Sequence, residues 1–482
     1  MHSQPIATPV SDTLLQESIT YATAHGICMT LPQRAGETLR CTHAPFSLLP
    51  TPIARDAWQK AIALGPLFGR LVDRIAHDPD WLRGTLAELG GSDDFTNRLL
   101  DVWAQAPQSQ ALTLGLHRSD YMYDAASGRL LQIELNTIAS SFGGLSSKIS
   151  RMHAYLARRY QLPHHSLPEN PASEALPAAI AAAHQCYCAQ QKIDPERAVV
   201  LFVVQMGESN AFDQLYLEYE LFRAHGVRVE RRSLAQIDAS LQLGPRAQLE
   251  IGDLEISVVY FRAGYSPQDH PTAHEWHARE TIERSLAIKC PSIAYHLVGT
   301  KKVQQALASP GSLQRFVANE NERTLLSASF AGLWRLSPET SAVQQDALMH
   351  PENYVLKPQR EGGGNNFYGE ELRTLLASLD EHERAAYILM ERIFPEPVDS
   401  ALIRDGIATV GPALAELGIF TAYIADGPAD RRVTVHNTYA GHIVRTKFLG
   451  VDEGGVATGF SCLSSPDLVD LDGSQDAASK TV

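Results

Sequence analysis

Apolar residues in the first part of the chain recur at helical spacing. Between residues 11 and 106, stretches such as 58–75 and 94–103 place apolar side chains three and four positions apart, which indicates amphipathic helices. The pattern changes at 111–136, where two runs of strand-forming residues flank the turn residues Ala126, Ser127 and Gly128. This change predicts a strand, a loop and a second strand. The SSFGG that follows is typical of a loop that opens a helix.

The middle of the chain alternates between strand and helix patterns. Residues 162–173 carry prolines and histidines and are a candidate linker, and an Ala-rich helix follows them. Strands are then predicted at 198–205, 227–233 and 256–262, with helices at 212–224 and 275–288. Strands that alternate with helices indicate a partly parallel sheet covered by helices.

The last third predicts an antiparallel sheet with flanking helices. Strands are expected at 386–393, 414–423 and 432–439, with Asp426 and Gly427 as turn residues between the last two. After Leu463 the periodicity is lost, so the sequence predicts a disordered tail over 464–482. The chain as a whole is expected to be a mixed α/β protein.

Composition narrows the class of protein. The chain has 482 residues, 44% of them hydrophobic and 20% charged, which describes an ordinary globular protein of several domains. Its formal net charge of −14 argues against binding to nucleic acid, which requires neutralisation of phosphates. No segment resembles a secretory leader or a membrane span, and the six scattered cysteines are typical of reduced thiols. We therefore expect a cytoplasmic protein that binds neither nucleic acid nor membranes.

The segment KPQREGGGNN at 357–366 is the strongest chemical motif. Three consecutive glycines let backbone N–H groups approach an anion closely, and Lys357 adds a positive charge. Glu361 would repel phosphate unless a divalent cation lay between them, and Mg²⁺ typically binds carboxylates together with phosphate oxygens. The chain has no Walker A pattern, so the site must be built in another way. The alternative for a Gly-rich stretch is a flexible surface loop.

Other candidate residues lie on the predicted strands and loops. Glu134 and Asn136 are two positions apart in QIELN and should project from one strand face, where they suit a hard cation or form an ordinary solvated face. Arg118, Arg262 and Arg445 are candidate clamps for a carboxylate, because a guanidinium binds carboxylates bidentately. Each of them taken alone is equally a salt-bridge partner. The GGVATG at 454–459 suits a mobile lid or a simple turn.

Taken together, these segments resemble the eukaryotic-type glutathione synthetases. The motifs that carry the resemblance occur in the family's order between about residue 45 and residue 463 and are LHRSDYM, QIELNTIASSFGGL, NAFDQ, VVYFRAGY, KCPSIA with VGTKKVQQ, VLKPQREGGGNNFYGEE, YILMERI, AELGIF, GHIVRTK and GGVATG. The resemblance implies an ATP-grasp fold, a homodimer, Mg²⁺ as cofactor and ATP as co-substrate. The implied reaction joins γ-glutamylcysteine to glycine through an acyl phosphate.

The resemblance also implies a division into domains. Residues 1–197 would form the helix-rich N-terminal part with the first ATP-grasp strands, and 198–303 an inserted βαβ-type substrate-binding domain. Residues 304–463 would form the ATP-grasp domain with its Gly-rich and Ala/Gly-rich lid loops, ahead of the 464–482 tail.

The resemblance assigns roles to individual residues. Arg118, Lys357 and Arg445 would be catalytic, and Glu134, Asn136 and Glu361 would hold Mg²⁺. The nucleotide would be bound by Glu134, Lys301, Lys357, Pro358, Gln359, Arg360, Glu361, Gly362, Gly363, Gly364, Asn365, Asn366, Tyr368, Met390, Glu391, Arg392, Ile393, Glu416, Lys447 and Glu453. The dipeptide and glycine would be bound by Arg118, Ile138, Ala139, Ser140, Ser141, Glu208, Ser209, Asn210, Gln214, Arg262, Ala263, Gly264, Tyr265, Arg445, Val456 and Ala457.

Two other functions remain open from the sequence. One is a homoglutathione-type ligase that uses β-alanine or another amine, since one methylene is worth only about 1 to 3 kcal/mol of discrimination. The other is an inactive, nucleotide-binding regulatory homologue. Retention of Glu134, Asn136, Glu361, Lys301 and Lys357 speaks against the second.

Overall fold

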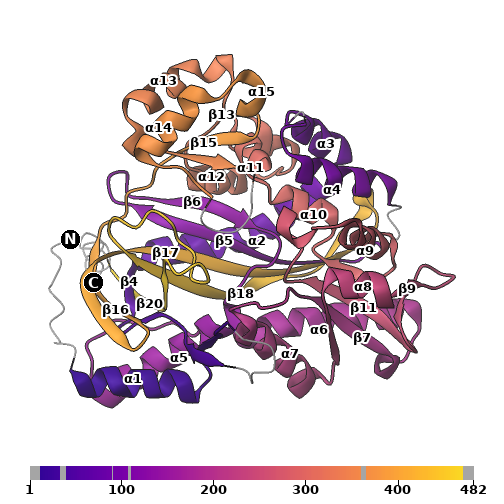
Figure 1. The fold of residues 1–482 in the computed structure, drawn as a ribbon, viewed down its shortest axis with the longest axis horizontal. Coiled ribbons are helices and arrows are strands. Elements are labelled where there is room, and N and C mark those ends of the chain that lie inside the picture. Colours follow the sequence, from indigo (N-terminus) through magenta and orange to yellow (C-terminus); the bar gives the residue numbers. More distant parts are fainter. Residues whose placement is uncertain (1–10, 33–39, 90, 107–109, 360–364, 471–482) are drawn as a thin grey trace, which may run out of the picture.

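Strands from both ends of the chain form one central sheet (Figure 1). The structure is a computed structural model, and it describes residues 11–32, 40–89, 91–106, 110–359 and 365–470. In spatial order the strands of the central sheet are β16 (Val398–Arg404), β3 (Phe46–Ser47), β19 (Cys462–Ser464), β18 (Val433–Phe448), β17 (Ile407–Asp426), β5 (Thr113–Asp124) and β6 (Arg129–Asn136). The mixed α/β class expected from the sequence is confirmed.

The pairing in this sheet differs from the expected one in one respect. The two strands predicted at 414–423 and 432–439 exist as β17 and β18 and pair antiparallel, but both are longer than predicted. They do not form a sheet with the 386–393 strand, because β17 pairs instead with β5, from Thr113↔Ala425 to Tyr121↔Leu417. Residues of the predicted first and third domains therefore share one sheet.

Helices cover both faces of the central sheet. Alternate residues of β17 point to opposite faces, so Leu417 and Ile419 pack with helix α2 (Arg55–Ala76) while Phe420 and Ala422 join the core beneath α5 (Gly143–Tyr160) and α6 (Ala172–Gln191). Helix α2 lies so close to β17 that a Cβ at Gly65 would be 2.6 Å from Thr421 Oγ1.

A second sheet with parallel strands occupies residues 198–290. Its path is β8 (Val229–Arg232), β7 (Ala198–Val203), β11 (Leu254–Phe261), β10 (Leu249–Ile251) and β9 (Gln242–Leu243), and β12 (Ile288–Cys290) pairs parallel with β11. The pairs β7–β8 and β7–β11 are also parallel, so the partly parallel sheet predicted for this segment is confirmed.

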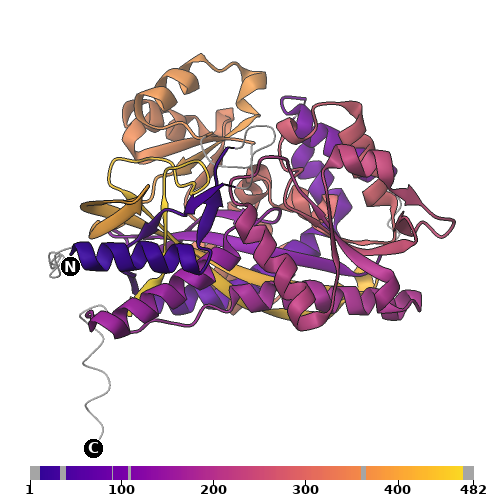
Figure 2. The same cartoon turned by 60° about the horizontal axis from the view of Figure 1, so that its bottom comes forward.

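A smaller lobe stands above the central sheet in both views (Figures 1 and 2). It contains an antiparallel sheet in the order β13 (Leu333–Arg335), β15 (Tyr387–Glu391), β14 (Tyr354–Pro358) and its own apolar core around Leu356, Leu372 and Leu389. The predicted strand at 386–393 is thus present, in this lobe.

The remaining elements connect these three bodies. The other helices are α1 (Asp12–Ala24), α3 (Pro79–Ala87), α4 (Asp94–Gln105), α7 (Ala211–His225), α8 (Leu234–Ser240), α9 (Ala273–Arg284), α10 (Ile293–Val298), α11 (Lys301–Ala308), α12 (Glu320–Ser329), α13 (Ser341–Met349), α14 (Gly369–Ser378) and α15 (Glu381–Arg384). Short 3-10 turns are η1 (Pro195–Arg197), η2 (Pro267–Asp269), η3 (Ser312–Arg315), η4 (Pro338–Thr340), η5 (Pro351–Asn353) and η6 (Ala429–Arg431). Among the described residues, no helix is long and apolar enough to span a membrane.

The prediction of a disordered tail is wrong for residues 464–469, which lie in or between strands. Strand β20 (Pro466–Val469) pairs parallel with β4 (Thr51–Ala54), and Asp467 accepts hydrogen bonds from the backbone N–H of Ser166 at 2.8 Å and of His165. A strand of four residues is too short to show a period, which is why the sequence pattern missed it. Residues 471–482 lie outside the described part of the chain.

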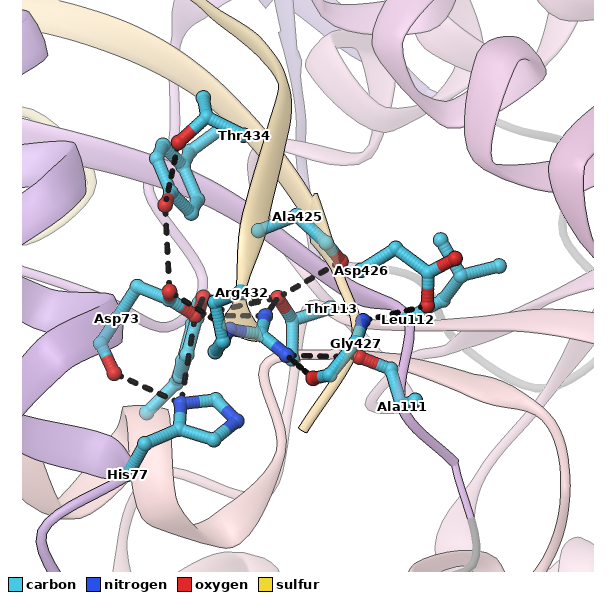
Figure 3. Close-up of polar contacts among 12 residues, drawn as sticks. Asp73, His77, Ala111, Leu112, Thr113, Ala425, Asp426, Gly427, Arg432 and Thr434 are labelled. Atoms are coloured by element: carbon cyan, nitrogen blue, oxygen red, sulfur yellow. Dashed lines mark hydrogen bonds and ion pairs between the residues drawn. The ribbon is translucent and has the colours of Figure 1, made fainter. Parts of the chain in front are cut away.

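One end of the central sheet holds a buried polar cluster (Figure 3). The Asp73 carboxylate of α2 accepts from Arg432 Nε at 2.9 Å and Nη2 at 2.8 Å, and from Tyr295 Oη at 2.6 Å. Tyr423 of β17 donates to the same carboxylate at 3.2 Å, and Arg432 Nη2 also donates to Thr113 Oγ1 at 2.6 Å. This cluster fastens α2 to the start of β5 and the turn between β17 and β18.

Candidate functional site

A cavity of about 300 Å³ lies at the other end of the same strands. It is formed where β5, β6, β17 and β18 meet the small lobe and two loops. Its lining is Arg118, Met122, Ile133, Glu134, Asn136, Ile138, Ala139, Ser140, Ser141, Phe142, Tyr265, Lys301, Val355, Lys357, Asn366, Tyr368, Met390, Glu391, Arg392, Ile393, Leu414, Glu416, Arg445, Lys447, Val451, Asp452, Glu453, Gly454, Gly455, Val456, Ala457 and Thr458.

Strand register brings the charged residues of the central sheet together. Arg118 lies opposite Asn136, and Asp120 opposite Glu134, in the β5–β6 pair, while Glu416 lies opposite Arg445 in the β17–β18 pair. Residues two apart on a strand share a face. The alternating positions expected for Glu134 and Asn136 therefore collect on the cavity side, although the four strands come from distant parts of the chain.

The two arginines share one buried carboxylate. Arg118 binds Asp120 bidentately, with Nε and Nη2 each at 2.7 Å from a carboxylate oxygen, and Asp120 is fully buried. Arg445 Nη2 lies 2.9 Å from the same carboxylate and also pairs with Glu416. These contacts hold both guanidinium groups in fixed positions at the cavity wall.

The surroundings of the partly buried Glu134 favour its ionised form. Burial opposes the charged form, but the positive charges of Lys301 and Arg445, followed by those of Lys357 and Arg118, outweigh it and lower the pKa of Glu134 to about 2. Asn136 Nδ2 donates to Glu134 Oε1 at 3.2 Å, so the two side chains lie next to each other. A charged carboxylate beside an amide supplies the hard oxygen ligands that fit Mg²⁺.

The third predicted metal ligand cannot be placed. Arg360, Glu361, Gly362, Gly363 and Gly364 lie outside the described residues. Among the residues that are described, no group of three or more His, Cys, Asp and Glu side chains is arranged to hold a metal. Asn136 is not one of these four residue types, and Glu361 is not among the described residues. The predicted set of Glu134, Asn136 and Glu361 therefore stays a prediction.

Basic side chains reach the cavity from three elements. Lys357 of β14 donates from Nζ to the backbone carbonyl of Ile133 at 3.1 Å, and Lys301 begins helix α11. Lys447 of β18 donates to the backbone carbonyl of Asp452. Burial lowers the pKa of Lys447 to about 8, although the charges of Asp452 and Glu453 oppose this shift.

The predicted lid loop at 454–459 lies against the small lobe. Arg392 Nη2 pairs with Asp452 at 2.7 Å, and the backbone N–H of Asn366 donates to Glu453 Oε1 at 3.2 Å. Val456, within the loop, is buried, with 3% of its surface exposed. Residues 454–458 therefore line one side of the cavity, and the preceding Asp452 and Glu453 join this segment to the small lobe.

The loop at 138–142 closes the opposite side in a constrained backbone conformation. Ala139 and Phe142 have φ of 51° and 69°, in the left-handed region that non-glycine residues rarely adopt. The buried carboxylate of Asp213 accepts from the backbone N–H of Phe142 at 2.7 Å and of Gly144 at 2.9 Å, which stabilises this conformation. Arg118 Nη1 donates to the carbonyl of Ser141 at 3.2 Å.

Part of the predicted dipeptide set lies behind this loop. Arg262 Nη1 donates to the carbonyl of Ser140 at 3.3 Å. Three buried polar atoms in this set, Arg262 Nε, Asn210 Oδ1 and Gln214 Nε2, have no hydrogen-bond partner among the described residues. Buried groups of this kind are normally satisfied, so orphaned donors and acceptors here indicate a place where a polar ligand or water binds.

The structure separates the predicted residues into three sets. Those that line the cavity are Arg118, Glu134, Asn136, Ile138, Ala139, Ser140, Ser141, Tyr265, Lys301, Lys357, Asn366, Tyr368, Met390, Glu391, Arg392, Ile393, Glu416, Arg445, Lys447, Glu453, Val456 and Ala457. Pro358, Gln359 and Asn365 line a neighbouring cavity that also touches Asn366. Glu208, Ser209, Asn210, Gln214, Arg262, Ala263 and Gly264 line neither.

Sequence reasoning missed the residues that support the site. Asp120 and Asp213 organise the arginines and the 138–142 loop, and neither was singled out. Asp120 had a readable signal, because it lies two positions after Arg118 on one predicted strand. Apolar wall residues were also missed, namely Met122, Ile133, Val355 and Leu414.

The chain is similar to known proteins over most of its length. The profile of the eukaryotic glutathione synthase ATP-binding domain matches residues 9–468. The chloroplastic glutathione synthetase of Solanum lycopersicum is 43% identical over 437 residues, covering 89% of this chain and 78% of the relative. The glutathione synthetase of Homo sapiens is 39% identical over 467 residues, covering 94% and 96%.

A solved structure shares the fold. A glutathione synthetase-like effector from Globodera pallida, in its apo form, superposes with a TM-score of 0.74 at 20% identity and covers 95% of this chain and 96% of that one. The family profile extends over nearly the whole chain, including every element of the cavity, and the two relatives cover 89% and 94% of the chain. The chain therefore belongs to the eukaryotic glutathione synthase family.

Proposed function

We propose that this chain joins γ-glutamylcysteine to glycine, with hydrolysis of ATP to ADP and phosphate. It is a ligase that forms a C–N bond, and ATP is its co-substrate. The observation that carries the proposal is the convergence of four cationic side chains on the partly buried Glu134 at the wall of the cavity. Lysine and arginine side chains gathered at one wall of a cavity suit a triphosphate and a transferring phosphoryl group.

The chemistry proceeds in two steps. A carboxylate is a poor acylating agent, so the cysteinyl carboxylate of the dipeptide attacks the γ-phosphorus of ATP, and ADP leaves. The glycine amine then attacks the resulting acyl phosphate, the C–N bond forms, and phosphate leaves. No covalent protein nucleophile is needed, and the residues act by position and charge.

The charged residues divide this work. Arg118 and Arg445, fixed by Asp120, face the reacting carboxylate and the developing charge of the phosphoryl group. Lys301 and Lys357 bind phosphate oxygens. When bound, Mg²⁺ neutralises charge between the phosphates, and Glu134, Asn136 and Glu361 are its proposed ligands.

The nucleotide base fits the apolar side of the cavity. Met122, Val355, Met390 and Leu414 supply apolar surface from two sheets. The backbone N–H groups of Glu391 and Arg392 already donate to Gly332 at 2.8 Å and to Asn353 at 2.9 Å. Adenine recognition by the 390–393 segment therefore depends on its other backbone groups.

The loops at 138–142 and 454–459 exclude water from the acyl phosphate. Val456 and Ala457 are the proposed neighbours of glycine, because they are small and line the cavity. Glu208, Ser209, Asn210, Gln214, Arg262, Ala263 and Gly264 are the proposed dipeptide contacts, and the orphaned polar atoms behind the 138–142 loop support this assignment.

We further propose a homodimer in the cytoplasm. Tyr219 and Phe222 on helix α7 are 59% and 63% exposed, and exposed aromatic side chains on one helix suit a protein interface. Sedimentation of the purified chain as a monomer would contradict the dimer.

The free thiols of the chain suit a reducing compartment such as the cytoplasm. Because relatives in Solanum lycopersicum and Arabidopsis thaliana are named chloroplastic, cell fractionation is the direct test of location.

The deciding experiment is ADP release with Mg-ATP and γ-glutamylcysteine in the presence of glycine, β-alanine or no acceptor. Glycine-dependent release, with the mass of glutathione in the product, supports the proposal. Faster turnover with β-alanine would identify the homoglutathione-type ligase. Nucleotide binding without any ADP release would identify an inactive homologue.

A further inference from the structure

The short strand pair that follows helix α1, drawn in indigo in Figure 2, carries a cysteine on each of its two strands. Strands β1 (Cys28–Thr30) and β2 (Cys41–His43) pair antiparallel, with Cys28 opposite His43 and Thr30 opposite Cys41. Opposite residues share a face of the pair, and so do residues two apart. Cys28 and Cys41 are therefore diagonal neighbours on one face.

The two thiols differ in access to solvent but interact with each other. Cys41 is exposed, whereas Cys28 is buried at 2% exposure. Burial raises the pKa of the Cys28 thiol to about 11, and the charge and hydrogen bonding of the Cys41 side chain also raise it. An exposed thiol beside a buried one is the arrangement in which the first reacts with a small molecule and the second resolves the product.

Strand β1 also holds the loop that carries three proposed dipeptide residues. The backbone N–H of Thr30 donates to the carbonyl of Ser209 at 2.7 Å. Thr30 Oγ1 donates to the carbonyl of Glu208 at 2.6 Å. Since Thr30 lies directly opposite Cys41 in the strand pair, any movement of β1 relative to β2 is transmitted to the 208–210 loop.

We propose that Cys28 and Cys41 form a dithiol–disulfide site that reacts with a small-molecule disulfide and that its oxidation weakens binding of the thiol dipeptide at the 208–210 loop. The Cys41 thiolate attacks one sulfur of the small disulfide, and one small thiol leaves. The Cys28 thiolate then attacks Cys41 Sγ in the mixed disulfide, and the second small thiol leaves. The protein loses two electrons and two protons, and the small disulfide is reduced to two thiols.

The register explains why oxidation should reach the loop. Diagonal neighbours in an antiparallel pair have Cα atoms roughly 7 to 8 Å apart. A disulfide requires at most about 6.8 Å. Closing the bond therefore pulls β1 toward β2, and Thr30 moves with it.

The first test maps the bond in the full-length protein. The chain is equilibrated in mixtures of reduced and oxidised glutathione, alkylated and digested, and its peptides are measured by mass spectrometry under non-reducing conditions. A Cys28–Cys41 cross-link within one chain supports the proposal. A cross-link between two chains, a stable mixed disulfide on Cys41 alone, or reduced Cys28 and Cys41 when other thiols have oxidised would overturn it.

The second test measures the coupling, and this part rests on the proposed function. Oxidised wild-type protein should show a KM for γ-glutamylcysteine raised about fivefold or more, which is the lower end of typical coupling between two sites. The KM of Cys41→Ser, whose side chain is exposed, should be insensitive to the redox buffer. Cys186→Ser on α6 is the matched control and should respond as wild type does.

The outcomes of the two tests are separable. An unchanged KM in protein that mass spectrometry shows to be cross-linked would overturn the coupling and leave the disulfide site standing. Reduced protein without any ligase activity would refute the proposed function, whereas the mapping experiment would still decide whether the disulfide forms.

Discussion

The central strands β5, β17 and β18 carry a buried ionic cluster at each of their two ends, and the clusters differ in how completely they are satisfied. At one end Asp73 binds Arg432, Tyr295 and Tyr423, and Tyr295 borders a cavity of only about 70 Å³. At the other end Arg118 and Arg445 border a cavity of about 300 Å³. The same sheet thus supports one closed cluster and one open cluster.

The charge balance differs in the same direction. Asp73 faces one guanidinium and several hydroxyl groups, which together neutralise it and fill its hydrogen-bonding capacity. In the open cluster, the positive charges of four side chains lower the pKa of Glu134. A buried charge that is fully paired within the protein offers nothing to a ligand, and removal of its partner destabilises the fold, whereas cationic side chains that line a cavity are suited to an anionic ligand.

The closed cluster should affect stability alone. Asp73→Ala leaves the largely buried guanidinium of Arg432 without its carboxylate partner, so we expect the free energy of unfolding to fall by about 3 to 5 kcal/mol. Chemical denaturation measures this loss. The exposed Asp430, which lies 3.4 Å from Arg431, is the matched control, and Asp430→Ala should change stability by less than about 0.5 kcal/mol. A marginal effect of Asp73→Ala would contradict the structural role.

The open cluster should affect activity with little effect on stability. Lys357→Ala removes a charge from the proposed phosphate site, so we expect kcat to fall about 100- to 1000-fold while the thermal transition is retained. Steady-state ADP release measures this loss. Lys60→Ala, at an exposed lysine 3.4 Å from Asp56, is the control and should retain wild-type turnover. Near-wild-type activity of Lys357→Ala would remove the lysine from the mechanism.

The pH dependence of ATP binding sharpens the same contrast. Burial lowers the pKa of Lys447 to about 8, so its ammonium is charged below pH 8 and neutral above it. If the charge contributes to phosphate binding, KM for ATP should rise about tenfold between pH 7 and pH 9. Lys447→Arg stays charged over this range and should flatten the profile. A wild-type profile in that variant would assign the pH dependence to another group.

The smallest expected effect lies at the rim of the closed cluster. Tyr423→Phe removes the hydroxyl that donates to Asp73 at 3.2 Å but leaves the stronger Arg432 pair intact. We expect the free energy of unfolding to fall by about 1 kcal/mol. A double-mutant cycle with Asp73→Ala should show coupling between the two positions. Strict additivity would mean that the hydroxyl contributes nothing to the cluster.

Local structure was predictable where a pattern is long enough to show a period. The strands that carry Arg118, Glu134 and Asn136 were predicted from alternation, and helix α2 from its apolar spacing. The partner of β5 was not predictable, because β17 lies about 300 residues away and no local signal sets its register. The short strand β20 was mistaken for part of a disordered tail for a different reason, because four residues are too few to show a hydrophobic pattern.

The candidate site shows the same division. The family motifs identified most of the side chains that line the cavity, and their charges indicated phosphate chemistry. The contacts of Asp120 and Asp213 depend on tertiary structure, because each carboxylate binds groups from other elements. Residues that touch a ligand are thus easier to recognise in a sequence than the residues that position them.

The pairing of β5 with β17 has a consequence for how the chain is made. Thr113 leaves the ribosome well before its partner Ala425 has been synthesised. At 5 to 20 residues per second, the interval for the roughly 300 intervening residues is about 15 to 60 seconds. Throughout that time one edge of β5 presents unpaired backbone N–H and C=O groups, so the nascent chain is expected to depend on chaperones that cover it until synthesis is almost complete.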